Sequence, residues 1–320
     1  MKQVLEFEKP LVRTREELDE LRRKHNVKPS DKLVVQIEEL EKKLQRLQED
    51  IYAHITPWQR VQIARHTLRP YMLDYAKLCF DEFVELHGDR HIGDDNAMPG
   101  GFATIDGRRV MLIGHQKGRD TKENLLRNFG SAHPEGYRKA LRLMRMAEKF
   151  SLPVISMIDT PGAFPGIGAE ERNIAEAIAF NLREMMTIRT PMISVVIGEG
   201  GSGGALGIGV TDRILMLENA YYSVISPEGC AAILWKDRKH APEAADALKL
   251  SAPHLKELGI IDGIIPEPIG GAHHDHAAAA QSLKTGLLAA LDELGRLPAE
   301  TLMAKRYDKF RAFGQFTEAV

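Results

Sequence analysis

Cysteine is scarce in this chain. Among its 320 residues only Cys79 and Cys230 are cysteines, and they lie far apart in the sequence. Two such residues provide neither a disulfide framework nor the paired spacing of a zinc site. Their scarcity fits a reducing compartment.

Long apolar runs and an excess of charge are also missing. No apolar run approaches the about 18 residues of a membrane span, and the first residues lack the apolar segment of a signal peptide. The net charge of -2 gives no basic excess of the kind that nucleic-acid binding as a main role requires. With 43% hydrophobic and 28% charged residues, the composition is that of an ordinary globular protein. We therefore expect a cytoplasmic protein that does not enter the membrane.

The first sixty residues are highly charged and have a helical pattern. From Leu33 onward, apolar residues recur in alternating steps of four and three, as in a heptad seam, at Ile37, Leu40, Leu44, Leu47 and Ile51. The seam is too short for a long coiled coil. It predicts an antiparallel helical hairpin with residues 11–21.

From about residue 100 to residue 265 the pattern changes to apolar strands that alternate with helices. The predicted strands cover residues 110–113, 154–158, 193–197, 214–217 and 222–225. Pro134 opens one intervening helix and residues 174–185 form another. Strands separated by helices indicate right-handed crossovers and largely parallel pairing.

Two glycine-rich segments, residues 159–168 and 198–207, follow the second and third of these strands. Five of the seven residues 198–204 are glycines, which predicts a loop between strand and helix. In a parallel sheet the carboxyl ends of the strands gather on one side and line the ligand crevice. Both segments should therefore face one site.

Three motifs overlap in the second segment. Residues 198–203 satisfy G-x-G-x-x-G, with Glu218 where a ribose-binding acid would stand, which would indicate dinucleotide binding. Residues 200–204 satisfy G-x-S-x-G, the nucleophile elbow of a serine hydrolase, with Ser202 as the nucleophile. A third interpretation needs no reactive side chain: glycine lets a substrate carbonyl approach the backbone, whose N–H groups then stabilise an oxyanion. Only the third also uses the segment 159–168.

The chain closely resembles the α subunits of the bacterial acetyl-CoA carboxylase carboxyltransferase. The matching stretches run collinearly from about residue 56 to residue 273. They are RPY (69–71), LDY (73–75), GHQKGR (114–119), NFG (128–130), PEGYRKA (134–140), IDTPGA (158–163), GAEER (168–172), GEGGSGGALG (198–207) and SVISPEGC (223–230).

The resemblance implies an α/β, crotonase-like (ClpP/crotonase) fold whose core, about residues 96–265, repeats ββα turns. The core would belong to a CoA carboxyltransferase C-terminal-type domain at residues 39–295. An N-terminal helical arm (1–38) and a C-terminal helical tail (296–320) would flank it.

The resemblance also implies an activity and partners. The family transfers the carboxyl group of N1-carboxybiotin, carried on the biotin carboxyl carrier protein, to acetyl-CoA and so makes malonyl-CoA for fatty acid biosynthesis. Biotin would not be attached to this chain. A β subunit would complete the active site in an α2β2 assembly and would hold the zinc, and biotin carboxylase would complete the ATP-dependent complex. A propionyl-type acyl-CoA carboxyltransferase or another crotonase-fold enzyme is the alternative.

Site residues follow from the same resemblance. The backbone N–H groups of Gly203 and Gly204 would form the oxyanion hole. A carboxybiotin pocket would add Gly162, Ala163, Gly201, Ser202 and Ala205.

Two basic residues and a histidine cluster lie outside the glycine-rich segments. Lys117 and Arg119 would contact a CoA phosphate or the partner subunit, unless they form salt bridges within the chain. No metal site is expected, since the adjacent residues His273-His274-Asp275-His276 cannot all converge on one ion.

Overall fold

One twisted sheet lies at the centre of the molecule, a computed structural model that describes residues 4–314. Within these residues the strand order is β1-β2-β3-β4-β5-β6-β8, and β7 pairs with β5. The strands are β1 (Glu82–Glu85), β2 (Gly100–Ile105), β3 (Arg108–Gly114), β4 (Val154–Thr160), β5 (Met192–Gly201), β6 (Arg213–Leu217), β7 (Tyr221–Ser223) and β8 (Gly263–Ile265). From β3 to β8 every pairing is parallel, as predicted.

The antiparallel pairs β1–β2 and β2–β3 were not predicted. Asp106 (φ 50°) and Gly107 (φ 73°) connect β2 to β3, and both adopt the left-handed conformation. Tight hairpin turns require this conformation, which explains the Asp-Gly pair. The antiparallel strands extend the parallel sheet at one edge.

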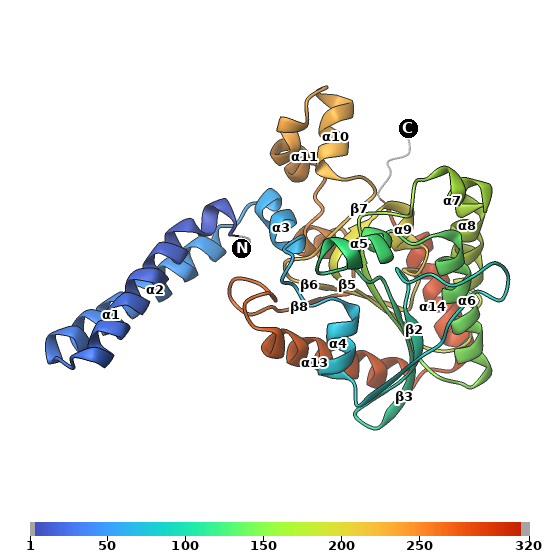
Figure 1. Ribbon diagram of the computed structural model, residues 1–320. Coiled ribbons are helices and arrows are strands. Elements are labelled where there is room, and N and C mark those ends of the chain that lie inside the picture. Colours follow the sequence, from blue (N-terminus) through green and yellow to red (C-terminus); the bar gives the residue numbers. More distant parts are fainter. Residues whose placement is uncertain (1–3, 315–320) are drawn as a thin grey trace, which may run out of the picture.

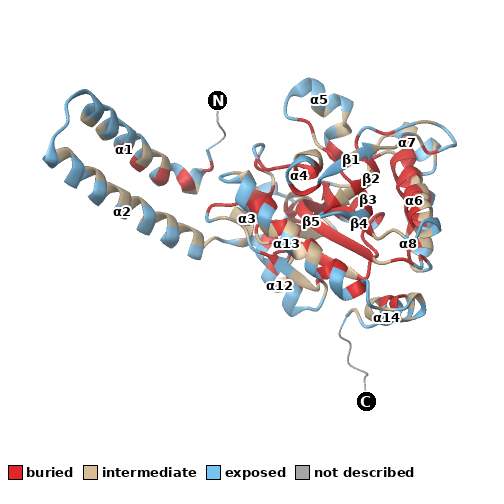
Figure 2. Ribbon diagram, turned by 90° about the horizontal axis from the view of Figure 1, so that it is seen from below, coloured by how far each residue is buried: buried red, intermediate tan, exposed pale blue. Residues whose placement is uncertain are grey.

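Strands β4 and β5 are the most buried strands, because every residue in them is buried. Helices cover both faces of the sheet (Figures 1 and 2). α6 (Pro134–Lys149) and α8 (Ile174–Met185) pack together on one face, and α4 (Met72–Cys79) packs with α13 (His276–Leu294) on the other. One face of α6 is apolar and buried, and its residues are Tyr137, Ala140, Leu141, Met144 and Ala147.

β5 is longer than the sequence pattern predicts. It continues through Gly198, Gly200 and Gly201, and α9 (Ser202–Leu206) begins at the next residue. The predicted loop at 198–201 is therefore wrong, because Gly200 pairs with β4 and with β7 and Gly201 pairs with β7. β7 itself ends at Ser223, two residues short of the predicted strand end at Ile225.

The N-terminal residues form an antiparallel hairpin, as predicted (Figure 1). The short η1 (Glu6–Glu8) leads into α1 (Lys9–Val27), which packs along α2 (Asp31–Ala53). Near its base η1 and α1 bury Leu5, Glu8 and Leu11, whereas α2 has no buried residue. The hairpin is thus anchored at one end and projects from the core.

Shorter helices complete the chain. α3 (Pro57–Ala64) links the arm to the core, and α5 (Thr121–Leu126), η2 (Asn128–Gly130) and α7 (Ile167–Glu171) occupy connections after strands. Another group follows β7: α10 (Pro227–Leu234), η3 (Arg238–His240), α11 (Ala241–Ala247) and α12 (Ala252–Glu257). The last helix is α14 (Ala299–Arg311). No helix in the described part of the chain is both long and apolar enough to span a membrane.

The predicted division into arm, central domain and tail remains a prediction. Its first boundary, at residues 38 and 39, falls inside α2, which runs without interruption. Its second boundary, at 295 and 296, falls between α13 and α14. Within α14, Arg306 is buried and donates to both carboxylate oxygens of Asp212 at 2.9 and 2.8 Å.

Candidate active site

The two glycine-rich segments meet at the carboxyl ends of β4 and β5, as the layout of the sequence predicts. Thr160 of β4 lies opposite Gly200 of β5. A Cβ atom on Gly201 would stand 2.3 Å from the carbonyl oxygen of Pro161. On Gly204 it would stand 2.5 Å from the backbone nitrogen of Ala163. These close approaches require glycine, because a side chain would separate the two segments.

The predicted pocket residues are therefore neighbours. Gly162 lies beside Ser202, since a Cβ atom on Gly162 would be 3.9 Å from that of Ser202. Gly201 and Ala205 are buried, Gly162 and Ala163 are half-buried, and Ser202 is exposed. The segment after β4 forms one wall and the first turn of α9 forms the other.

The backbone N–H groups of Gly203 and Gly204 belong to the first turn of α9. N–H groups of a first helical turn have no partner within the helix. Over residues 4–314 the structure shows no hydrogen bond from either group to another acceptor. The Gly204 carbonyl is held on the other side by the Tyr137 hydroxyl, which donates to it at 3.2 Å. Two unused donors thus stand side by side at the junction of strand and helix.

Gly203 differs from Gly204 in the space around it. A Cβ atom on Gly203 would meet nothing nearer than the Ile178 side chain at 3.8 Å. Gly203 is half-buried, whereas Gly204 is buried against Gly162 and Ala163. Glycine is therefore required sterically at 204 and not at 203.

Ser202 adopts the left-handed conformation with φ 53°. This is the position of a nucleophile in the elbow motif, but among residues 4–314 no hydrogen bond joins Ser202 to a histidine. A serine nucleophile needs such a base to activate it. The arrangement of the described residues therefore gives the hydrolase interpretation no support.

Replacing Ser202 with glycine tests this point. We expect Ser202→Gly to retain the enzymatic activity within about twofold, because no base among the described residues activates the hydroxyl. Relief of the left-handed strain should be offset by the greater freedom of glycine in the unfolded chain, so the free energy of unfolding should change by less than about 1 kcal/mol. Steady-state kinetics and urea unfolding measure both. Loss of activity in a folded variant would reinstate a catalytic role for the hydroxyl.

The dinucleotide interpretation also lacks its structural context. Its glycines at 198–201 lie in β5 and form no phosphate-binding loop. A Cβ atom on Gly198 would stand 2.5 Å from Oδ1 of Asp159, so this glycine serves the packing of the adjacent strand. Glu218, the predicted ribose ligand, accepts a hydrogen bond from the backbone N–H of Glu267 at 3.2 Å.

A buried ion-pair network lies beneath the glycines. The Lys117 ammonium group donates to Oδ1 of Asp159 at 2.7 Å and to Oε2 of Glu199 at 2.6 Å. The same Asp159 oxygen accepts the backbone N–H of Glu199 at 2.9 Å. Asp159 is the penultimate residue of β4 and Glu199 lies in the extension of β5, so Lys117 connects the two strand ends that support the site.

The electrostatics of this network are dominated by the opposite charges. Burial alone would lower the pKa of Lys117, but the two carboxylates raise it above its usual value. Burial alone would raise the pKa of Glu199, but Lys117 and Arg65 lower it to about 2. Lys117 and Glu199 are therefore both charged at neutral pH.

The network continues toward α3 and α10. Glu199 Oε1 accepts from Arg65 Nε and from the Tyr221 hydroxyl, both at 2.7 Å. Arg65 also donates to Glu228 at 2.5 Å. The interactions among Asp159, Glu199, Arg65 and Tyr221 were not predicted from the sequence. In the sequence, the only sign of this network is that the charged residues Asp159 and Glu199 follow the apolar runs of two buried strands.

For Lys117 the structure shows the salt bridges within the chain that the sequence analysis gave as the alternative to a CoA or partner contact. With its side chain only 12% exposed and both carboxylates bound, this residue positions the strand ends and does not offer a free charge to CoA. Arg119 is more exposed, but it donates to the carbonyl of Thr67 and to Asp74, and it stacks 4.0 Å above the Tyr71 ring. Both side chains thus have partners within the chain.

Two solved structures with a similar arrangement of elements are a transcarboxylase and a malonate decarboxylase. Transcarboxylase 12S, with methylmalonyl-coenzyme A and methylmalonic acid bound, aligns with a TM-score of 0.57 and 19% identity. The alignment covers 71% of this chain and 42% of that longer chain. A Pseudomonas malonate decarboxylase hetero-tetramer in complex with coenzyme A aligns at 0.56 with 17% identity, over 68% of this chain and 86% of the other. These likenesses confirm the predicted crotonase-like α/β fold.

Sequence relatives are closer. Residues 4–314 match the family described as acetyl co-enzyme A carboxylase carboxyltransferase-like. The acetyl-coenzyme A carboxylase carboxyl transferase subunit alpha of Geobacter metallireducens is 56% identical over 98% of both chains. The protein of the same description from Thermus thermophilus is 52% identical over 98% of this chain and 99% of the other. With this match over nearly its whole length, the chain belongs to the acetyl co-enzyme A carboxylase carboxyltransferase-like family.

Proposed function

We propose that this chain is the α half of a split carboxyltransferase, which transfers the carboxyl group from N1-carboxybiotin to acetyl-CoA and yields malonyl-CoA for fatty acid biosynthesis. One observation supports the location of the site above all others. Among the described residues, the N–H groups of Gly203 and Gly204 have no acceptor, and they stand where the two glycine-rich segments meet.

These two N–H groups would act on the ureido oxygen of biotin. Negative charge develops on this oxygen as the carboxyl group leaves as CO2, and fixed donors stabilise such charge without reorganising. Gly162, Ala163 and Ser202 would line the space that the ring enters, because they border the two donors. No protein nucleophile is required, which agrees with the absence of a histidine bonded to Ser202 among the described residues.

Carboxybiotin supplies the CO2 and, once the carboxyl group has left, a basic nitrogen for the methyl proton of acetyl-CoA. The residues of this chain bind and orient that group through the backbone. The ion pairs of Lys117 hold the ends of β4 and β5, and so they fix the distance between the two walls of the site.

A second subunit would complete the site. Each glycine-rich segment carries one large apolar side chain that is exposed. Ile167 is 79% exposed and Leu206 is 38% exposed. Exposed apolar surface near a site is typical of a partner interface. We propose that a β subunit covers it, supplies the hole for the acetyl-CoA enolate and holds the zinc of the complex, in an α2β2 assembly. Biotin carboxyl carrier protein and biotin carboxylase are the remaining proposed partners, and the cytoplasm is the proposed location.

Reconstitution tests this proposal. We expect malonyl-CoA from carboxybiotin and acetyl-CoA only when this chain is mixed with its β subunit, because the two oxyanion sites would lie on different chains. The measurement compares each subunit alone with the mixture, and includes propionyl-CoA as a competing acceptor. Malonyl-CoA formation by this chain alone would disprove the split site, and a clear preference for propionyl-CoA would change the assigned substrate.

A further inference from the structure

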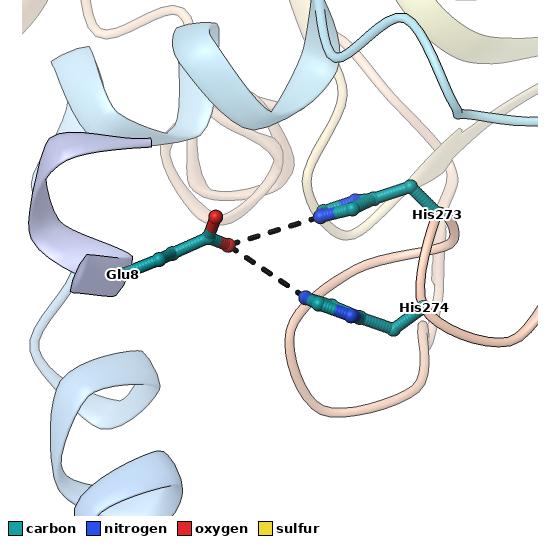
Figure 3. Close-up of side chains that lie close together, drawn as sticks. All are labelled: Glu8, His273 and His274. Carbon is teal, nitrogen blue, oxygen red and sulfur yellow. Dashed lines mark ion pairs between the residues drawn. The ribbon is translucent and has the colours of Figure 1, made fainter. Parts of the chain in front are cut away.

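Three potential metal ligands from distant parts of the chain meet at the base of the N-terminal arm (Figure 3). Glu8 ends η1, and His273 and His274 lie in the connection between β8 and α13. Oε1 of Glu8 is 3.8 Å from Nε2 of His273 and 3.7 Å from Nε2 of His274. All three ligand atoms lie within 4.8 Å of one another.

Within residues 4–314, His273 has no hydrogen-bond partner for either ring nitrogen, although its side chain is only 3% exposed. A buried polar group that makes no hydrogen bond costs about 1–3 kcal/mol of stability, so its presence calls for an explanation. The faces of the ring are covered, because its centroid lies 4.0 Å from that of His66 and 4.2 Å from that of His274. Its Nε2 edge points toward Glu8 (Figure 3).

Glu8 is held in place from the arm side. Its Oε1 accepts from the Tyr52 hydroxyl at 2.6 Å, and its Oε2 accepts from the backbone N–H of Leu5 at 3.3 Å. Its side chain is 7% exposed. The carboxylate is therefore oriented toward the two rings before any ligand arrives.

The neighbouring residues Asp275 and His276 do not join the cluster. Asp275 caps α13 by accepting from the backbone N–H of Ala278 at 2.9 Å, and Nε2 of His276 lies 2.7 Å from the carbonyl oxygen of Leu68. This arrangement separates the side chains of the four consecutive residues 273–276, which do not all face one point. It does not exclude a site made from two of them and Glu8, a residue distant in sequence.

We propose that Glu8, His273 and His274 bind one divalent transition-metal ion, of which Zn²⁺ is the model. Imidazole nitrogen with carboxylate oxygen suits Zn²⁺ and not Mg²⁺ or Ca²⁺. Zinc bonds of about 2.0–2.2 Å in a tetrahedron place donor atoms about 3.4 Å apart. The Glu8 oxygen therefore needs to approach each histidine nitrogen by only about a few tenths of an ångström, from 3.8 and 3.7 Å, while the two rings turn toward a common point. Water would fill the fourth position on the side of His274, whose side chain is 27% exposed.

The ion would join the arm to the core. Glu8 belongs to the arm and both histidines belong to the core, so the metal would cross-link them. A ligand that binds the folded state alone stabilises it. The site is separate from the glycines that follow β4 and β5, and the proposal is independent of the carboxyl-transfer reaction.

Metal binding by the untagged full-length chain, stripped with a chelator, tests the proposal. We expect about one equivalent of Zn²⁺ by calorimetry, and Co²⁺ absorption bands that Zn²⁺ abolishes. His274→Gln and Glu8→Gln should each weaken binding by at least about tenfold, since even outer partners of metal ligands have effects of this size. His276→Gln is the matched control and should bind as the wild type does. No saturable binding, or equal binding by His274→Gln and His276→Gln, would overturn the proposal.

Hydrogen exchange tests the cross-link itself. Zn²⁺ should slow exchange of the first amides of α1 in the wild type and leave them unchanged in His274→Gln. The measurement needs no catalytic activity, so it separates this proposal from the proposed function. Zn²⁺ that binds without slowing exchange in α1 would show that the ion does not hold the arm.

Discussion

Replacing Gly203 with proline (Gly203→Pro) should abolish most of the enzymatic activity without unfolding the protein. Proline lacks the backbone N–H and is tolerated in the first turn of a helix, so it removes one proposed oxyanion donor and little else. Loss of one such donor costs about 10²–10³ in kcat, or about 2.7–4 kcal/mol of transition-state stabilisation. The assay is malonyl-CoA formation by the chain reconstituted with its β subunit.

The experiment needs a matched background and a matched control. Proline restricts the backbone angles of the residue before it, and Ser202 already has φ 53°. Gly203→Pro and its control are therefore both made together with Ser202→Gly, since glycine adopts this conformation without strain. The control, Gly203→Ala, keeps the N–H, and its Cβ atom meets nothing nearer than 3.8 Å. We expect the alanine variant to stay within about twofold of the background, because the donor that acts in the transition state is intact. Equal activity of the proline and alanine variants, with equal thermal stability, would remove Gly203 from the oxyanion hole.

Replacing Lys117 with methionine should have the largest effect on stability. The change leaves the Asp159 carboxylate buried without its cation and leaves Glu199 with Arg65 alone. Removing one partner of a buried ion pair typically costs about 3–5 kcal/mol. Urea unfolding at pH 7 measures this loss. Lys122→Met, an exposed position on α5, is the control and should change the free energy of unfolding by less than about 0.5 kcal/mol.

Neutralising the orphaned carboxylates should restore stability. Asp159→Asn and Glu199→Gln, added to Lys117→Met, remove the uncompensated charge and keep groups that accept hydrogen bonds. A triple variant no more stable than the single variant would show that Lys117 contributes through packing alone.

The pH dependence of Lys117→Met follows from the same charges. In the wild type the folded-state pKa of Glu199 is about 2, below its usual 4.5, so its contribution is present above pH 4.5 and is lost as the pH falls toward 2. In the variant, Glu199 remains buried but loses the ammonium group of Lys117, so its folded-state pKa is raised. A raised pKa favours the folded state at low pH, so the deficit relative to the wild type should shrink between pH 7 and pH 5. A deficit independent of pH would contradict the charge explanation.

Periodicity in the sequence was enough to locate most of the sheet and its helices. The β-branched runs at 154–158 and 193–197 became β4 and β5, because such residues pack well in strands buried on both faces. The pattern could not show where β5 ends. Its last four residues are glycines and a glutamate, which disfavour strands locally, and they are held in the sheet by partners on β4 and β7.

The site shows the same division. From the order of strands alone, residues 159–168 and 198–207 were expected to meet, and they do. The partners of Lys117 could not be predicted, since Asp159 and Glu199 are 42 and 82 residues away in the sequence. Neither could the meeting of Glu8 with His273 and His274, which depends on how the arm seats against the core.

The sequence by itself determined the family, the alternation of strands and helices, and the glycines at which backbone must approach backbone. These are local or collinear properties, and they are present in the order of residues along the chain. Only the tertiary structure decided that the glycines extend a strand, that Lys117 forms ion pairs with two carboxylates behind the site and that two adjacent histidines face one carboxylate. These depend on contacts between residues far apart in the chain, whose distances and burial are fixed only when the elements pack together.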